Sequence, residues 1–310
     1  AFKTGSHRLP NADWSPDFPK TAAAIRWFFD KGGEIEPDIL ITLNLATVQQ
    51  VLKIVGEVEV GEYQIKLNEE NVYDWLQNEA EIDFFPGSTQ KKDAISALGK
   101  ALVNKIENLD WKTKIELAKL LIDDLEKKNV VVNSLDENFE EILRAKGWAG
   151  EYSPIPHFVT TGIVEINLGA NKANCCIERK TKYKITESKN NLIHSIELRL
   201  KNNSPFEFPV KPLFYGGNYL SYLRFYLPVE AENIQVQAWP SEINSLETWP
   251  EPYDGVKGKI NIDQVYGFKE VGFFHLTKAG TESSVLVNYQ IPDKKTSEFW
   301  LAILKQHGLR

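Results

Sequence analysis

Two carboxylates and one arginine precede the first predicted helix of the chain, and a second arginine lies within it. Asp13 and Asp17 lie in residues 11–19, a proline-containing stretch that leads into this helix, and Arg8 and Arg26 lie on either side. One or two carboxylates with substrate oxygens are a usual ligand set for Mg²⁺, and a helix N-terminus beside cations can hold a phosphate. We therefore predict a phosphate or ligand site at these four residues, with Asp13 and Asp17 as candidate Mg²⁺ ligands. The alternative is a turn that starts the helix and anchors it with aromatic side chains.

A second polar stretch, residues 83–93, also precedes a predicted helix. It contains the hydroxyl groups of Ser88 and Thr89 and the adjacent cations Lys91 and Lys92. Lysine ammonium groups can neutralise a pyrophosphate as point charges. The alternative is that Ser88 or Thr89 caps the helix while both lysines are solvated.

The two cysteines of the chain, Cys175 and Cys176, are adjacent. Because neighbouring residues of a strand point to opposite faces, we expect two unpaired thiols, one of them in a core. A vicinal disulfide is the alternative. The chain has no Cys-x-x-Cys pair and its histidines are scattered, so we expect neither a zinc site nor a Ser/His/Asp triad.

The composition is that of a globular chain without a spanning segment. The sequence has 310 residues, of which 42% are apolar and 25% charged, and about 150 residues per domain suggests two domains. No run of about 18 apolar residues occurs. The net charge of −7 argues against nucleic acid as a partner, since such a binder needs a concentrated basic face.

Helical and strand patterns alternate in the first half of the chain. The apolar run at residues 38–44 predicts a strand that is covered on both faces, and a hairpin is expected around Gly61. Apolar residues at helical spacing predict helices at 22–30, 46–55, 69–81, 93–109, 111–128 and 135–146. Residues 1–150 therefore form a predicted α/β domain.

Period-2 patterns fill the second half and predict an antiparallel β-sandwich at residues 151–310, which gives an α+β fold of two domains. The residues from 206 to 226 are rich in aromatics, which can line a carbohydrate groove or alternate between core and surface. The predicted strands lie at 162–168, 176–185, 193–200, 222–227, 234–238, 257–262, 265–276, 284–291 and 299–304.

Five segments carry a family resemblance; they lie at residues 12–19, 83–93, 167–174, 222–228 and 304–306. Through them the chain resembles a bacterial family of unknown function that is common in Patescibacteria (candidate phyla). Members of that family are membrane-anchored and extracytoplasmic. The resemblance implies a location in the cell envelope or on the cell surface. It also implies a membrane anchor and an arginine-containing motif outside this sequence.

The first half is also distantly similar to LytR-CpsA-Psr phosphotransferases. The similarity covers the first helix, Gly32-Gly33, the strand that ends at Asn44, the helix to Val55 and residues 56–60. It implies a LytR-CpsA-Psr-like α/β module. Those enzymes transfer glycopolymers from a polyprenyl pyrophosphate carrier to the cell wall with arginines, aspartates and Mg²⁺. At the matching position, residues 83–93 contain no arginine, and lysine does not replace a bidentate arginine clamp.

Two hypotheses for the function follow. In the first, the chain has a non-catalytic binding or structural role at the cell surface. Its partner is a cell-wall glycopolymer or a surface protein. Self-assembly by strand addition at a sheet edge is a further alternative. In the second, it is a LytR-CpsA-Psr-like phosphotransferase. Asp13, Asp17 and Arg26 then lie near the metal and phosphate, and Lys91 and Lys92 assist.

Overall fold

The described part of the protein consists of two compact units, each of which has its own core. The helical unit comprises the described residues up to Glu151, with His307, and the sheet unit comprises those from Tyr152 to Gln306. The predicted mixture of helices and antiparallel sheets is confirmed, and none of the described sheets is closed. A computed structural model describes residues 9–81, 89–169, 171–188, 191–208, 216–241, 244, 259–292 and 300–307.

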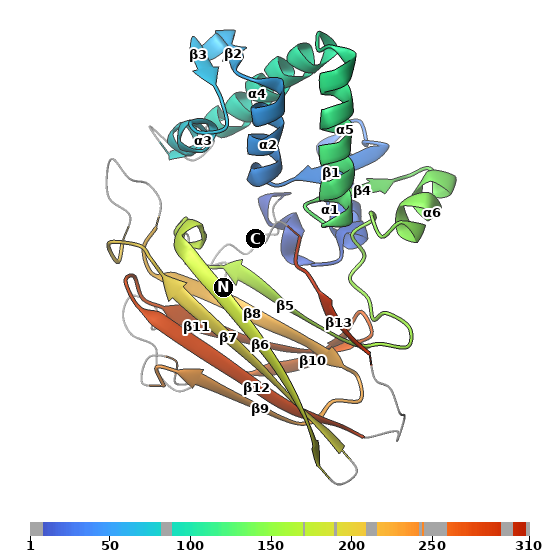
Figure 1. Ribbon diagram of the computed structural model, residues 1–310, viewed down its shortest axis with the longest axis vertical. Coiled ribbons are helices and arrows are strands. Elements are labelled where there is room, and N and C mark those ends of the chain that lie inside the picture. Colours follow the sequence, from blue (N-terminus) through green and yellow to red (C-terminus); the bar gives the residue numbers. More distant parts are fainter. Residues whose placement is uncertain are drawn as a thin grey trace. The chain divides into compact units, whose positions relative to one another are not determined.

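The helical unit contains all the α-helices of the described residues and two small sheets (Figure 1). Strand β1 pairs antiparallel with β4, and β2 pairs antiparallel with β3. The helices are α1 (Phe18–Gly32), α2 (Leu45–Val55), α3 (Val72–Glu81), α4 (Gln90–Glu107), α5 (Trp111–Glu126) and α6 (Glu137–Ala145). The strands and 3₁₀ turns are β1 (Ile39–Leu43), β2 (Val58–Val60), β3 (Ile65–Leu67), β4 (Val130–Ser134), η1 (Leu9–Trp14) and η2 (Gly61–Tyr63).

Side-chain caps and an apolar core explain why these helices form. Asn44, Asp110 and Asp136 each accept a hydrogen bond from a backbone N–H in the first turn of α2, α5 and α6. Such a cap contributes about 1 kcal/mol. The apolar faces of α2 to α5 pack with the β2–β3 hairpin around Leu52, Leu67 and other buried side chains.

Strand β1 departs from its predicted environment. Ile39, Ile41 and Leu43 are 48%, 58% and 56% exposed, whereas every residue of its partner β4 is buried. The expectation of a strand covered on both faces is therefore wrong for β1. The apolar run specified a strand, but it does not specify which neighbours cover that strand.

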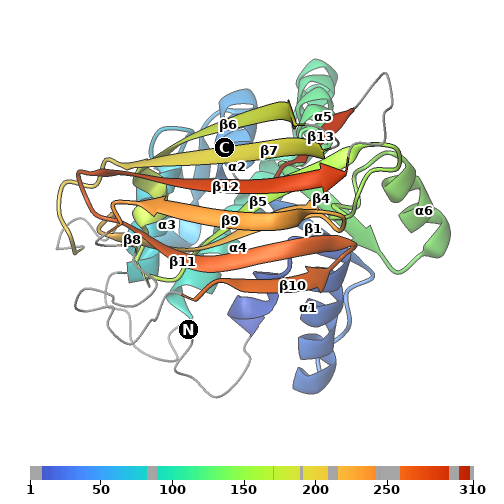
Figure 2. The ribbon, with the colours of Figure 1, turned by 90° about the horizontal axis from the view of Figure 1, so that it is seen from below.

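The sheet unit contains two sheets whose inner faces share one core. The five-stranded sheet has the order β10-β11-β8-β5-β13, and the four-stranded sheet has the order β6-β7-β12-β9 (Figure 2). All pairs are antiparallel except β13 with β5. The elements are β5 (Val159–Asn167), η3 (Ala173–Cys176), β6 (Ile177–Ser188), β7 (Asn191–Asn202), β8 (Tyr219–Pro228), β9 (Glu232–Trp239), β10 (Asn261–Val265), β11 (Phe268–Thr277), β12 (Glu282–Pro292) and β13 (Leu301–Leu304).

Alternating side chains decide which face of each strand is buried. Leu198 and Val287 from the four-stranded sheet pack in the same core cluster as Leu223 and Phe273 from the five-stranded sheet. On β7 the intervening residues are not buried, and on β9 they are exposed. The four-stranded sheet therefore buries one face and presents the other to solvent.

Candidate functional site

Asp13 and Asp17 lie on consecutive elements at the start of the helical unit. Asp13 is exposed in η1, and Asp17 is the half-buried residue before α1, where its backbone N–H donates to Ser15 Oγ over 3.1 Å. Within the described ranges, no group of three or more His, Cys, Asp or Glu side chains could hold a metal ion. Mg²⁺ binding by these two aspartates stays a prediction.

Arg26 is buried inside the helical unit. Its guanidinium donates to Asn133 Oδ1 over 2.5 Å, to the Pro37 carbonyl over 3.0 Å and to the Asp38 carbonyl over 3.3 Å. The Asn133 amide in turn donates to Glu140 Oε1 over 2.9 Å. Arg26 thus connects α1, β4 and α6, and a phosphate would have to compete with these bonds.

Of the remaining predicted phosphate ligands, the structure describes the side chain of Lys92. Arg8 and the side chain of Lys91 lie outside what the structure describes, and Lys92 is exposed in the first turn of α4. Helix α1 packs with η1 and β4, whereas α4 packs with α3 and β2. The structure therefore does not bring Lys92 and Arg26 together. Thr89 precedes α4, and its hydroxyl donates to Asp93 Oδ2 over 2.6 Å.

The buried histidines of the sheet unit serve its packing. Burial lowers the pKa of His275 to about 3 and the pKa of His194 to about 4, so both imidazoles are neutral at pH 7. His275 Nε2 lies 2.8 Å from Ser283 Oγ, and the His194 ring stacks on Tyr289 at 4.9 Å. These rings lie inside the core and do not form an accessible acid–base site.

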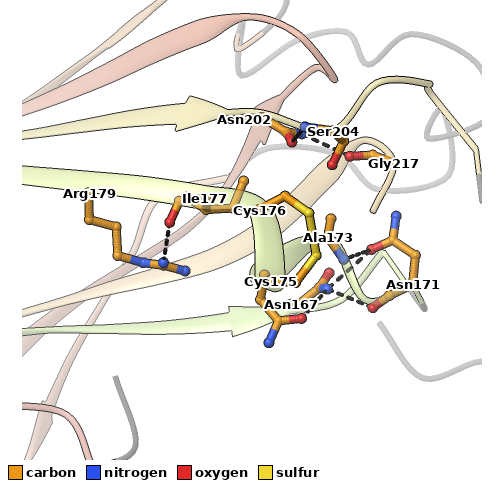
Figure 3. The surroundings of a disulfide bond; sticks show 11 residues. Asn167, Asn171, Ala173, Cys175, Cys176, Ile177, Arg179, Asn202, Ser204 and Gly217 are labelled. Carbon is orange, nitrogen blue, oxygen red and sulfur yellow. Dashed lines mark hydrogen bonds between the residues drawn. A yellow bond between two sulfur atoms is a disulfide. The ribbon is translucent and has the colours of Figure 1, made fainter. Parts of the chain in front are cut away.

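The adjacent cysteines form a disulfide, so the prediction of two unpaired thiols is wrong (Figure 3). Both cysteines lie on the 3₁₀ turn η3 and not on a strand, so the rule that neighbours point to opposite faces does not apply. Cys175 is exposed and Cys176 is half-buried. The Cys176 carbonyl accepts the Asn203 N–H over 2.9 Å, which fixes the turn beside β7.

Asparagine side chains hold the loop that carries this disulfide. Asn167 Nδ2 donates to the Asn171 carbonyl over 2.8 Å, and Asn171 Nδ2 donates to the Asn218 carbonyl over 2.7 Å (Figure 3 shows the first pair). Asn218 Oδ1 accepts the Ala279 N–H over 2.8 Å. Asn167 and Asn171, from a segment that contributed to the family resemblance, therefore connect the loop after β5 to the residue before β8, and Asn218 connects that residue to the β11–β12 turn.

The solvent side of the four-stranded sheet, here called the outer face, concentrates exposed polar side chains. Lys180, Lys182 and Lys184 alternate along β6 and are all exposed; we call them the lysine column. On the adjacent strand β7, the outer-face residues Arg199 and Lys201 are also exposed. The outer face thus has a basic half, although the net charge of the chain is −7.

The strand register places cations and carboxylates side by side in the basic half. Lys180 is opposite Arg199, Lys182 is opposite Glu197, and Lys201 is opposite Glu178. A shallow depression of about 100 Å³, open to solvent, lies here. Charged side chains of three strands line it: Glu178, Lys180, Arg199, Lys201 and Glu282.

The other half of the outer face carries amides and an indole. Gln235 and Gln237 on β9 are exposed, and Gln235 is opposite Asn288 on β12. Trp239 is 45% exposed and opposite Ser284. Amides offer both donors and acceptors, and the indole offers a flat apolar surface with one N–H donor.

Sequence reasoning missed the outer face as a site. The signal was present as Lys-x-Lys-x-Lys from residue 180 to residue 184 and as Arg-x-Lys at residues 199–201. The aromatic-rich segment predicts a carbohydrate groove as one alternative, but Tyr219, Phe225 and Tyr226 from it are fully buried. Only the pairing of β6 with β7 shows that the two basic patterns are adjacent.

The comparisons with known proteins cover the start of the chain. A family model described as "Protein of unknown function (DUF4012)" matches residues 2–80. No curated protein and no solved structure matches the chain. The similarity supports a family of unknown function over those residues, most of which belong to the helical unit, and it does not extend to the outer face.

Proposed function

We propose that this chain is an extracytoplasmic protein of the bacterial cell envelope with a non-catalytic binding role. Its ligand is a cell-wall glycopolymer, which binds on the outer face of the four-stranded sheet. The observation that carries the proposal is the grouping of exposed amide, indole and ammonium groups on this one face. We further propose that the sheet unit is a β-sandwich and that the helical unit is a LytR-CpsA-Psr-like module. We also propose that the protein belongs to the family that is common in Patescibacteria.

The chemistry of this face suits a sugar polymer. Sugar hydroxyls both donate and accept hydrogen bonds, and Gln235, Gln237 and Asn288 can do the same. The exposed ring of Trp239 offers a flat surface for the apolar side of a sugar ring. An extended sheet face also differs from the concave pocket that encloses a small substrate. It can therefore bind several units of a chain at once.

The disulfide supports a location outside the cytoplasm. Disulfides persist in oxidising compartments and are rare where thiol reductants are abundant. The bond between Cys175 and Cys176 therefore favours the envelope or the cell surface. In the part of the chain that the structure describes, no helix combines the length and apolar character that crossing a membrane requires. We propose that the membrane anchor implied by the family resemblance lies outside this sequence.

The structure gives less support to the phosphotransferase hypothesis than to the binding hypothesis. It requires cations that converge on a phosphate, but Arg26 is bonded to the Pro37 carbonyl and to Asn133. Lys92 belongs to a different part of the helical unit. We therefore prefer binding to catalysis.

Binding of a purified bacterial cell-wall polysaccharide fraction, measured by calorimetry, tests the proposal. The variant Trp239→Ala with Gln237→Ala removes the indole and one amide, and we expect it to weaken binding about tenfold, equivalent to about 1.4 kcal/mol. Trp300→Ala is the matched control, because Trp300 is 60% exposed in the same unit but precedes β13 of the other sheet. Absence of binding by the folded chain, or equal loss in both variants, contradicts the proposal.

A further inference from the structure

We infer that the glycopolymer on the outer face is a polyanion whose repeating phosphate or carboxylate groups bind the lysine column. This inference rests on the proposed function and adds the charge class of the ligand. Lys180, Lys182 and Lys184 occupy alternate positions of β6. Alternate residues of a strand lie about 7 Å apart on one face, so the three ammonium groups form a line of regularly spaced positive charge.

Nearby carboxylates do not neutralise this line. Glu197 faces Lys182 across the strand pair, but its Oε1 accepts a hydrogen bond from Arg199 Nε over 2.7 Å. Glu178 Oε1 accepts from Asn203 Nδ2 over 2.7 Å. None of the three column lysines forms an ion pair with any residue that the structure describes. Their charge is thus available to a ligand.

Protection of a sheet edge does not account for all of this charge. β6 is an edge strand of its sheet, and lysines on an edge discourage pairing with another chain. Arg199 and Lys201, however, lie on β7, whose two edges are both occupied by β6 and β12. Cations on an interior strand do not serve edge protection. Arg199 pairs with Glu197, and Lys201 is opposite both Glu178 and Glu282, so the charge offered to a ligand comes mainly from the lysine column.

A polysaccharide fits the face better than a nucleic acid does. The net charge of −7 repels a dense polyanion such as nucleic acid at long range. A polysaccharide also carries hydroxyl groups, so it can extend from the lysine column toward the hydroxyl-binding groups on β12 and β9. Lysine, a point charge on a flexible stem, accepts phosphate or carboxylate at varied angles.

Four probes distinguish the alternatives: polygalacturonate, poly(glycerol phosphate), neutral dextran and a single-stranded DNA oligonucleotide. We expect the chain to bind at least one of the two acidic polymers more tightly than dextran or DNA. Binding of the acidic polymer should weaken as salt rises from about 0.05 M to about 0.5 M, because exposed charges are screened. The preferred acidic polymer then identifies phosphate or carboxylate as the recognised group.

Charge-matched variants locate the site. Lys180→Gln, Lys182→Gln and Lys184→Gln together should lower affinity for the acidic polymer about tenfold or more. The control replaces three exposed lysines of the helical unit, Lys53, Lys100 and Lys119, by Gln and changes net charge equally. The affinity of this control for the acidic polymer should be within about twofold of the affinity of the original chain. Circular dichroism checks that the Gln variant is folded. Arginine at the three column positions, which keeps the positive charge, should restore binding.

Each contrary result has a separate meaning. Dextran binding that equals acidic-polymer binding, with no effect of the column variant, overturns this inference while the proposed function stands. Tighter binding of DNA than of either acidic polymer also overturns it. Failure of the folded chain to bind any polysaccharide, including the cell-wall fraction, overturns the proposed function and this inference with it.

Discussion

Arg199 Nε donates a 2.7 Å hydrogen bond to Glu197 Oε1 on the same strand, which occupies the carboxylate that faces Lys182. This pairing leaves Lys182 as a cation on the outer face. The relationship is local to β7, because both residues point to the same side of the sheet two positions apart. It explains how a face with several acidic residues can still present positive charge.

Removal of this carboxylate should strengthen polyanion binding. Glu197→Gln takes away one negative charge beside Lys182 and releases Arg199, and we expect a two- to fivefold gain in affinity, roughly the effect of one exposed charge. Calorimetry with the preferred acidic polymer at low salt measures the change. Glu230→Gln, away from this strand pair, is the control with the same change in charge and should leave the affinity unaltered. Weaker binding by Glu197→Gln would contradict the assignment.

Arg26 should matter for stability and not for binding by the outer face. Arg26→Ala leaves Asn133 and the Pro37 carbonyl without their buried donor, which should cost about 1–3 kcal/mol of unfolding free energy. Urea unfolding monitored by circular dichroism measures this cost. Lys112→Ala is the control, because that side chain is exposed on α5, and it should change stability by about 0.5 kcal/mol or less. Equal stability of the Arg26 variant and the original chain would refute the internal role.

The buried histidines should make the sheet unit sensitive to acid. An unfolded histidine has a pKa of about 6.5, whereas burial lowers the pKa of His275 to about 3 in the folded protein. The unfolded chain therefore binds a proton that the folded protein excludes. The contribution of His275 to the free energy of unfolding is fully present above about pH 6.5. It falls as pH drops below that value, and the loss is about 2 kcal/mol at pH 5.

The slope of stability against pH is the measurement for this residue. His275→Gln should flatten the decrease between pH 6.5 and pH 5, whatever its effect on stability at neutral pH. A slope that is the same in the His275 variant and in the original chain would contradict the buried, neutral state of this ring.

The disulfide should protect both cysteines from alkylation until it is reduced. Iodoacetamide should label neither Cys175 nor Cys176 in protein purified without reductant, because both sulfur atoms are bonded. After dithiothreitol has reduced the bond and formed its own cyclic disulfide, both thiols should be labelled. Peptide mass spectrometry reads out each residue. Full labelling before reduction would show that the two thiols are not paired.

Much of the local structure follows from the sequence, and the exceptions have physical reasons. The helix that ends at Gly33 and the alternating strands of the second half are local patterns of spacing and turn residues. The pattern at residues 265–276 predicts a single strand, but this range includes a hairpin turn. Tyr266 and Gly267 both have positive φ there, which ends β10 and begins β11. Tyrosine gives little warning of that conformation.

The candidate site was harder to predict than the fold, because it depends on register. Alternation places Lys180 and Arg199 on the solvent faces of their own strands, but pairing between β6 and β7 sets them opposite each other. Residues 19 positions apart are neighbours only after the hairpin forms. Similarly, the charge of Arg26 suggested a ligand, whereas its partner Asn133 lies 107 positions further along the chain. Spacing alone did not indicate that partner.

Lysine acetylation with and without the bound polymer tests the central claim most directly. The cell-wall polysaccharide fraction or the preferred acidic polymer is added before acetylation, and peptide mass spectrometry measures the modification of each lysine. The account predicts that Lys180, Lys182 and Lys184 become protected while Lys53, Lys100 and Lys119 react as before. Polymer binding that leaves the lysine column fully reactive, or that protects the helical unit instead, would contradict it.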